Sequence, residues 1–551
     1  MNISNKPDAT TLPDEPMFRR MVDNAIARPS HVVISDKSIG VEADSMRIFA
    51  DLLHMKNAIR KHETSPDAFI SVLMPINYEF VITILAVLAS GQAFASIRFG
   101  CPAEYALSLM RLSGSTCLVY GALEKNFAIE MQHLASAQGS PIQIIPFESS
   151  TEPLPLQLED LNLRMDTEIP TDPDRPGMLV YSSGTTGEKP KGILHNRRFL
   201  DRPGQLPPQE IFLMISDPVQ AISSFNILTI PLSTGCQLHF ISRADGVAEI
   251  WEQFCNNRIC SFTTIPDTWN EMAWYYRNRI QQLPQEARDG YLEGARRIMF
   301  PCTQGNITPA SVLRFWKEDL QCPIYNVFGA TELGGLALCT GPDTVSDDYK
   351  CIGKPKPGIT AKLSDGDHGE LLVKSPNVMS GYMNDPKRTK SVFDEEGFYR
   401  TGDFAHLSPE GEYIYEERIN KPTKDPVHVM ETTFSAFPFL HNTLVAQIPF
   451  DNVYGSSMVS SVVCIRPPPS SSSSKTKVSI AEYMADCMYR LRAALSLAFL
   501  QLDMFPMAVC VLGPGEEMKL EKEQLRYVFP YHVDPSFRAD LELGVHRAWM
   551  N

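Results

Sequence analysis

The sequence contains no C-x-x-C pair, and its 12 cysteines are scattered along 551 residues. This spacing lacks the usual zinc motifs and gives no sign of a disulfide framework, so we expect a reduced, cytosolic protein. Long hydrophobic runs are also missing, because the longest, Phe80 to Ala95, includes Gly91 and Gln92 and is too short to cross a bilayer. The N-terminal stretch MNISNKPDATTLPDEP has no apolar core and does not resemble a secretory signal.

An excess of positive charge is absent as well. The net charge is −15 and the isoelectric point lies near 5.3. A surface of this sign repels the phosphate backbone of nucleic acids. We therefore expect no nucleic-acid partner and no membrane span.

Short apolar runs alternate with helical patterns through the first 410 residues or so. This alternation is typical of mostly parallel sheets that are covered by helices, so we predict an α/β fold. The patterns predict two helices, at 78–89 and 102–112. They predict strands at 69–76, 93–97, 116–121, 177–183, 236–242, 295–301 and 323–329.

The pattern changes near residue 360. Short alternating strands at 359–365, 369–375 and 411–417 are separated by Gly and Asp, which predicts a small antiparallel sheet or barrel. After Arg418 the α/β pattern returns, with strands at 459–466 and 508–513 and a helix near 480–500. The Pro/Ser run at 467–475 is typical of a solvated loop. We predict a large domain at 1–419 and a small domain at 420–551.

The stretch Y-S-S-G-T-T-G-E-K-P-K-G (181–192) combines small residues with lysines. Small residues allow a close backbone approach and supply hydrogen-bond donors, and lysines supply positive charge, which together suit a polyphosphate. No Gly-Lys-Ser/Thr closes the stretch, so it is not a P-loop. On its own it could equally be a flexible surface loop.

Three further stretches decide between these interpretations. They are NVFGATELGG (326–335), GELLVKSPNVMSGYMND (369–385) and GFYRTGDFAHLSPEGEYIYEERINK (397–421). In this order and spacing, the four stretches strongly resemble the adenylate-forming superfamily, which includes acyl- and aryl-CoA synthetases. The resemblance covers about residues 40 to 420 and weakens after that.

The resemblance implies both fold and activity. It implies a large N-terminal AMP-binding domain of two parallel α/β subdomains plus a small β-rich subdomain, followed by a small mobile α+β C-terminal domain. It also implies an ATP- and Mg²⁺-dependent ligase that adenylates a carboxylic acid, releases pyrophosphate and then forms the CoA thioester.

The resemblance also assigns roles to residues. Ser182 to Lys191 would be the phosphate loop, Phe328 would stack on adenine, and Thr331 would bind the α-phosphate. Glu332 would hold Mg²⁺, because a carboxylate beside a triphosphate requires a cation between them. Asp403 would accept the ribose hydroxyls, with Arg418 nearby. The predicted nucleotide contacts are Ser182, Ser183, Gly184, Thr185, Thr186, Gly187, Lys189, Gln304, Gly305, Asn326, Phe328, Gly329, Ala330, Asp403 and Arg418; the predicted catalytic residues are Lys191, Thr331, Glu332 and Lys519.

The C-terminal part departs from the family pattern. The family places a catalytic lysine after a glycine near the chain end, whereas here Met518 precedes the best-aligned Lys519, and Lys522 is a possible substitute. The hinge position is Asn420. The segment after it, KPTKDPVHVMETTF, contains no glycine where the family lines its pantetheine tunnel. This departure leaves the CoA step open.

The segment SDPVQAISSFN (216–226) bears on the substrate. Relatives that activate amino acids carry an aspartate where this chain has Ala221 to Ser224. Without that aspartate a buried α-ammonium would lack a partner, so we expect a fatty or aromatic acid rather than an amino acid. Gln220, Phe225 and Gly334 are the predicted substrate-pocket residues.

Other functions stay open at this point. The acyl group could pass to an acyl-carrier-protein thiol or to an amine instead of CoA. A nucleotide-binding relative without catalysis and a luciferase-like oxygenase are also conceivable on this fold, since a fold does not determine function.

Overall fold

The computed structural model separates the chain into two compact units, Met1–Ile97 with Ala103–Lys421, and Arg98–Pro102 with Pro422–Asn551. The assignment of an AMP-binding domain to 1–419 and of a small C-terminal domain to 420–551 remains a prediction. The structure describes residues 10–62, 68–97, 101, 103–152, 154, 158–166, 169, 172–182, 191–201, 206, 210–216, 231–242, 245–419, 440–449, 457–465, 507–511 and 545–547.

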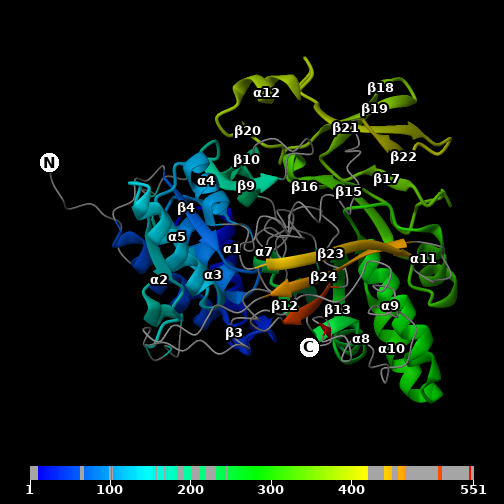
Figure 1. Cartoon of the computed structure of the whole chain (residues 1–551), viewed down its shortest axis with the longest axis horizontal. Helices are drawn as coiled ribbons and strands as arrows, with labels where there is room; N and C mark the ends of the chain where they lie inside the picture. Colours follow the sequence, from blue (N-terminus) through cyan, green and yellow to red (C-terminus); the bar gives the residue numbers. More distant parts are fainter. Residues whose placement is uncertain are drawn as a thin grey trace. The chain divides into compact units, whose positions relative to one another are not determined.

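The first sheet of the larger unit has seven strands in the order β20-β10-β9-β5-β4-β6-β7. Figure 1 labels β20, β10, β9 and β4 among them. Strands β9, β5, β4, β6 and β7 run parallel, whereas β10 is antiparallel to both of its neighbours. The strands are β4 (Phe69–Leu73), β5 (Ala93–Ser96), β6 (Cys117–Tyr120), β7 (Gln143–Pro146), β9 (Pro176–Ser182), β10 (Lys191–Asn196) and β20 (Gly381–Tyr382).

Helices accompany this sheet in the expected alternation. Helix α3 is apolar on nearly every face and almost entirely buried, and the side chain of Asn77 caps it by accepting from the backbone N–H of Phe80. The helices of this part are α1 (Pro16–Ala27), α2 (Ser45–Arg60), α3 (Tyr78–Ala89), α4 (Ala103–Ser113) and α5 (Lys125–Ala137); β1 (Thr11–Pro13) and β8 (Arg164–Asp166) form a separate parallel pair.

The second sheet has thirteen strands in the order β18-β19-β21-β22-β17-β16-β15-β14-β13-β11-β12-β2-β3. Its parallel part contains β2 (Val32–Asp36), β11 (Ile211–Ser216), β12 (Gln237–Ser242), β13 (Ile259–Thr264), β14 (Phe300–Thr303) and β15 (Tyr325–Ala330), with β3 (Val41–Asp44) antiparallel at the edge. The helices around it are α7 (Pro231–Thr234), α8 (Gly246–Asn256), α9 (Pro266–Asn278), α10 (Gln285–Arg297) and α11 (Ala310–Arg314).

A cluster of buried tryptophans forms the core beneath these helices. Trp251 stacks on Trp316 with ring centroids 5.4 Å apart, and Trp269 meets Trp316 edge to face at 4.7 Å. Each of the three indole N–H groups donates to a backbone carbonyl, for example that of Trp269 to Cys302 at 3.0 Å. This core supports the strand end that leads to Gln304.

The β-rich part continues the same sheet rather than forming a separate barrel. Strand β16 pairs antiparallel with β15, and the ladder runs on through β17, β22, β21, β19 and β18. These strands are β16 (Gly335–Cys339), β17 (Cys351–Pro355), β18 (Thr360–Asp365), β19 (His368–Lys374), β21 (Tyr399–Leu407) and β22 (Tyr413–Arg418), with helix α12 (Pro386–Ser391) between β20 and β21.

The smaller unit contains a four-stranded sheet in the order β23-β24-β25-β26. Strands β24 and β25 are parallel, and the outer pairs are antiparallel. The bounds are β23 (Leu440–Pro449), β24 (Ser457–Ile465), β25 (Met507–Val511) and β26 (Val545–Arg547). The helix predicted near 480–500 and the loop predicted at 467–475 lie outside the described residues.

Most element predictions in the larger unit are confirmed, and one is wrong. The segment 295–301 is not one strand, because helix α10 runs through Arg297 and β14 begins at Phe300. Within the part of the chain that the structure describes, no helix is both long and apolar enough to cross a bilayer.

Candidate active site

The predicted phosphate loop starts and ends at one point of the first sheet. Strands β9 and β10 are antiparallel, with Ser182 opposite Lys191 and Tyr181 opposite Gly192. Residues 183–190 therefore connect two paired strand ends. The ammonium of Lys191 lies 5.7 Å from the ring centroid of Tyr382.

Thr331 and Glu332 lie in a single turn directly after β15. Thr331–Leu333 forms one 3-10 turn (η7), and Gly334 ends it with φ of 72°, in the left-handed region. A Cβ at Gly334 would lie 2.3 Å from the carbonyl oxygen of Asn377. Gly334, predicted for the substrate pocket, thus allows close backbone packing that positions the turn.

The carboxylate of Glu332 has one occupied and one open oxygen. Tyr382 donates its hydroxyl hydrogen to Oε1 at 3.0 Å, while Oε2 accepts no hydrogen bond from any residue that the structure describes. Burial and the neighbouring Glu332 carboxylate raise the pKa of Tyr382, so this hydroxyl stays protonated and remains a donor.

A buried histidine connects β10, the strand after the predicted phosphate loop, to the same turn. His195 in β10 donates from Nε2 to the carbonyl oxygen of Thr331 at 2.9 Å. Burial lowers the pKa of His195 to about 4, so the ring is neutral at physiological pH. Neither residue was predicted from the sequence: His195 lies three positions after the 181–192 stretch, whereas Tyr382 lies inside the 369–385 stretch.

Asp403 and Arg418 lie opposite each other on β21 and β22. Their closest charged atoms, Asp403 Oδ1 and Arg418 Nη1, are 3.8 Å apart. The Asp403 carboxylate is buried, yet it accepts no hydrogen bond from the described residues. Burial raises the pKa of Asp403 to about 6, with Glu370 and Glu332 adding repulsion and Arg418 opposing both.

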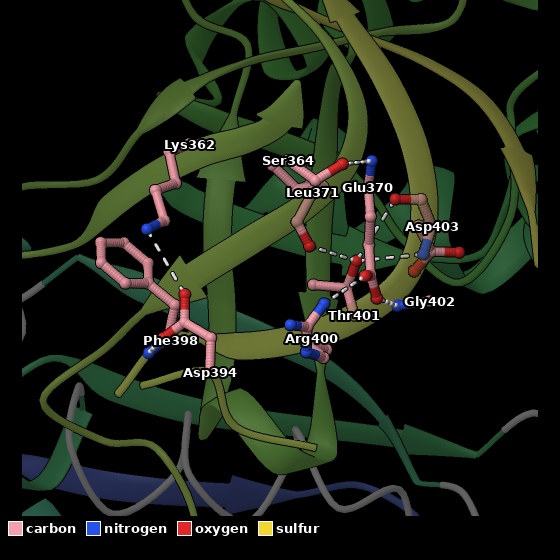
Figure 2. Close-up of polar contacts among 10 residues, drawn as sticks. All are labelled: Lys362, Ser364, Glu370, Leu371, Asp394, Phe398, Arg400, Thr401, Gly402 and Asp403. Atoms are coloured by element: carbon pink, nitrogen blue, oxygen red, sulfur yellow. Dashed lines mark hydrogen bonds and ion pairs between the residues drawn. The ribbon is translucent and has the colours of Figure 1, made fainter. Parts of the chain in front are cut away.

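The backbone beneath Asp403 is held by its neighbours (Figure 2). The hydroxyl of Thr401 donates to the carbonyl of Leu371 at 2.7 Å and accepts from the N–H of Asp403 at 3.1 Å. Glu370 accepts from Gly402 N–H at 3.1 Å and from Arg400 at 3.1 Å. Glu370 therefore already has its hydrogen-bond partners, whereas Asp403 presents a carboxylate without them.

Gln304 lies at the carboxyl end of β14, next to β15. Its backbone N–H donates to Thr264 at 3.0 Å, but its buried Oε1 has no partner among the described residues. Gly305 follows with φ of 94°, in the left-handed region. Asn326 donates its amide hydrogens to the carbonyls of Tyr349 and Cys351, so its NH₂ group holds a neighbouring loop.

Phe328, Gly329 and Ala330 complete the described part of the nucleotide motif. Phe328 and Ala330 are partly buried against the core of the β-rich part, and a Cβ at Gly329 would lie 2.4 Å from the carbonyl oxygen of Gly335. The structure thus places Lys191, Thr331, Glu332 and Tyr382 in one connected group. Predicted site residues outside the described residues are Ser183, Gly184, Thr185, Thr186, Gly187, Lys189, Gln220, Phe225, Asn420 and Lys519.

Comparison with known families identifies this chain. The profile described as AMP-binding enzyme matches residues 49–383, which is more than half of the sequence. The chain belongs to this family. The predicted membership of the adenylate-forming superfamily and the predicted α/β fold class are thereby confirmed.

Individual relatives agree with the family. The chain is 32% identical over 461 residues to "Acyl-CoA ligase oryP" of Aspergillus oryzae, covering 80% of this chain and 81% of that protein. It is 24% identical to a malonate–CoA ligase of Arabidopsis thaliana, covering 72% and 68%. The structure of the amide bond synthetase McbA from Marinactinospora thermotolerans matches with a TM-score of 0.62 at 18% identity, covering 93% and 99%, which shows the fold.

Proposed function

We propose that this AMP-binding enzyme adenylates a carboxylic acid with ATP and Mg²⁺ and transfers the acyl group to the thiol of CoA. The named CoA ligases among its relatives support this activity. The absence of an acidic residue in Ala221 to Ser224 favours a fatty or aromatic acid over an amino acid.

The observation that carries the proposal is a set of acceptor atoms that receive no hydrogen bond from the described residues. Gln304 Oε1, Glu332 Oε2 and the Asp403 carboxylate accept no hydrogen bond from described residues, although Gln304 and Asp403 are buried. Buried polar groups in proteins are normally satisfied. These three acceptors are best explained by a ligand that brings hydroxyl groups, an amino group and a cation.

The donor set fits Mg²⁺ shared with a nucleotide. Among the residues that the structure describes, no three His, Cys, Asp or Glu side chains are grouped to hold a metal by themselves. Magnesium commonly takes one or two carboxylates and completes its shell with phosphate and water oxygens, so Glu332 alone suffices. When bound, the cation would neutralise phosphate charge; Glu332 would hold it and Asp403 would orient the ribose.

A second acceptor is favoured by one specific feature. The segment 421–434 lacks the glycine that the family uses beside the pantetheine tunnel. Transfer to an amine or to an acyl-carrier protein is therefore the alternative second step. Lys519, or Lys522 in its place, would serve the first step in either case.

The product distinguishes these acceptors. We expect mass spectrometry of the protein with ATP, Mg²⁺, CoA and a panel of fatty and aromatic acids to detect acyl-CoA. Acyl-AMP that persists in the presence of CoA would favour an amine or carrier protein. Retained turnover after Lys519 and Lys522 are both replaced by Ala would contradict the assigned lysine.

Lys191→Ala tests the role of the loop lysine. Because Lys191 lies at the strand end that closes the phosphate loop, we expect its loss to slow acyl-adenylate formation about tenfold to a hundredfold. AMP lacks the β- and γ-phosphates, so the affinity for AMP should change less than about threefold. This change corresponds to the small free energy of an exposed ion pair. Pyrophosphate release and AMP titration measure the two effects, and equal losses in both would contradict this role.

A further inference from the structure

One short segment connects the phosphate-loop strand to the turn that carries Glu332. The N–H of Met379 donates to the carbonyl of Glu332, that of Ser380 donates to Leu194, and that of Met383 donates to Gly192, each at 2.7 Å. Strand β20 within this segment pairs with β10, with Tyr382 opposite Ile193. The backbone of 379–383 therefore contacts both parts of the predicted site.

The side chain of Tyr382 also contacts both parts, through Glu332 and Lys191. Its hydroxyl donates to Glu332 Oε1 at 3.0 Å, and the ammonium of Lys191 lies 5.7 Å from its ring centroid. The guanidinium of Arg388 lies 5.4 Å from the same centroid. The ring is buried, and its backbone N–H is held by Thr389 Oγ1 at 2.9 Å, so the hydroxyl has a defined position.

We propose that Tyr382 is the positioning residue of this site: its hydroxyl fixes Oε1 of Glu332, which would leave Oε2 to bind a cation, and its ring positions the ammonium of Lys191. The inference rests on the proposed function, because it assumes that Glu332 holds Mg²⁺. Partners that orient a metal ligand commonly contribute tenfold to a hundredfold to metal affinity.

The chain offers a matched control in Tyr413. This tyrosine is also buried in the β-rich part, and its hydroxyl donates to the carbonyl of Ala361 at 2.8 Å, a backbone acceptor outside the candidate site. Tyr413→Phe and Tyr382→Phe each remove one buried hydroxyl from an otherwise unchanged ring. Any difference between them in metal binding then reflects the acceptor, not the loss of a hydroxyl.

The experiment is an electron paramagnetic resonance titration of Mn²⁺ into the full-length protein with saturating ATP and no acid. We expect the Kd of Mn²⁺ to rise about tenfold in Tyr382→Phe and to stay within twofold of wild type in Tyr413→Phe. ATP binding without metal should be the same in both variants. Glu332→Gln should abolish the protein-dependent Mn²⁺ signal.

The outcomes distinguish the positioning role of Tyr382 from the proposed function. If Glu332→Gln loses Mn²⁺ but Tyr382→Phe binds it like Tyr413→Phe, the positioning role is wrong and the proposed function stands. If wild type and Glu332→Gln bind Mn²⁺ alike, both the metal site and the inference fail. If Tyr382→Phe weakens Mn²⁺ and metal-free ATP equally, the residue acts on the nucleotide site as a whole and the inference also fails.

Discussion

Glu332→Gln is expected to reduce acyl-adenylate formation at least a hundredfold, equivalent to about 3 kcal/mol of transition-state stabilisation. Glutamine keeps the shape of the side chain, and its oxygen can still accept from Tyr382, so the turn after β15 should keep its geometry. What is lost is the negative charge that would hold a divalent cation against the phosphates. ATP–pyrophosphate exchange at saturating Mg²⁺ measures this loss.

Glu370→Gln is the matched control for that experiment. Glu370 also lies near Asp403, but its oxygens are already bonded to Gly402 N–H and Arg400. We expect its substitution to change the exchange rate less than about fivefold, because a partly exposed pair with Arg400 contributes little. Similar losses in the two variants would indicate a general effect of negative charge and would contradict the assigned role of Glu332.

Asp403→Asn is expected to stabilise the nucleotide-free protein while weakening ATP binding. Burial raises the pKa of Asp403 from 3.8 to about 6, so above pH 6 the folded protein holds an ionised carboxylate in an unfavourable environment. A pKa shift of this size corresponds to a destabilisation of the folded protein by about 3 kcal/mol, and an uncharged asparagine removes most of this destabilisation. ATP affinity should fall at least about tenfold, because one amide oxygen replaces two carboxylate oxygens that would accept from ribose.

The pH dependence of stability has a definite sign. Between about pH 4 and 6 the folded chain binds a proton at Asp403 that the unfolded chain has released. The contribution of Asp403 to stability therefore decreases as the pH rises through this range, and this dependence should disappear in Asp403→Asn. Urea unfolding at pH 5 and pH 8, with ATP titration on the same samples, measures both effects.

Asp394→Asn, in contrast to Asp403→Asn, should destabilise the folded protein. Burial alone would raise the pKa of Asp394, but the Phe398 N–H at 2.8 Å and the nearby Lys362 ammonium hold this pKa below its usual range (Figure 2). The Glu396 N–H, at 3.0 Å, adds a further hydrogen bond to the carboxylate. Its carboxylate thus stabilises the fold above the unfolded-state pKa, and this contribution is lost as the pH falls. If Asp403→Asn destabilises the protein as Asp394→Asn does, the Asp403 carboxylate is structural.

Local patterns were sufficient for many elements. Helix α3 has the predicted bounds, Tyr78–Ala89, because an apolar run, the Asn77 cap and Gly91 at its end all act within neighbouring turns. The prediction of one strand at 295–301 is wrong because it also rests on local pattern alone. Ala295 and Arg297 favour a helix, the residues from Phe300 on favour a strand, and a local pattern does not show where one ends.

The sequence by itself determined the family and the fold class, and it predicts the stretches that bind the nucleotide, because small residues, carboxylates and lysines occur there at recognisable spacings. Only the tertiary structure decided which of these side chains meet. Tyr382 lies 50 positions from Glu332, in a strand of two residues that is too short to show any periodicity. The role proposed for it rests on the pairing of β20 with β10, which is a contact between distant segments that no local propensity encodes.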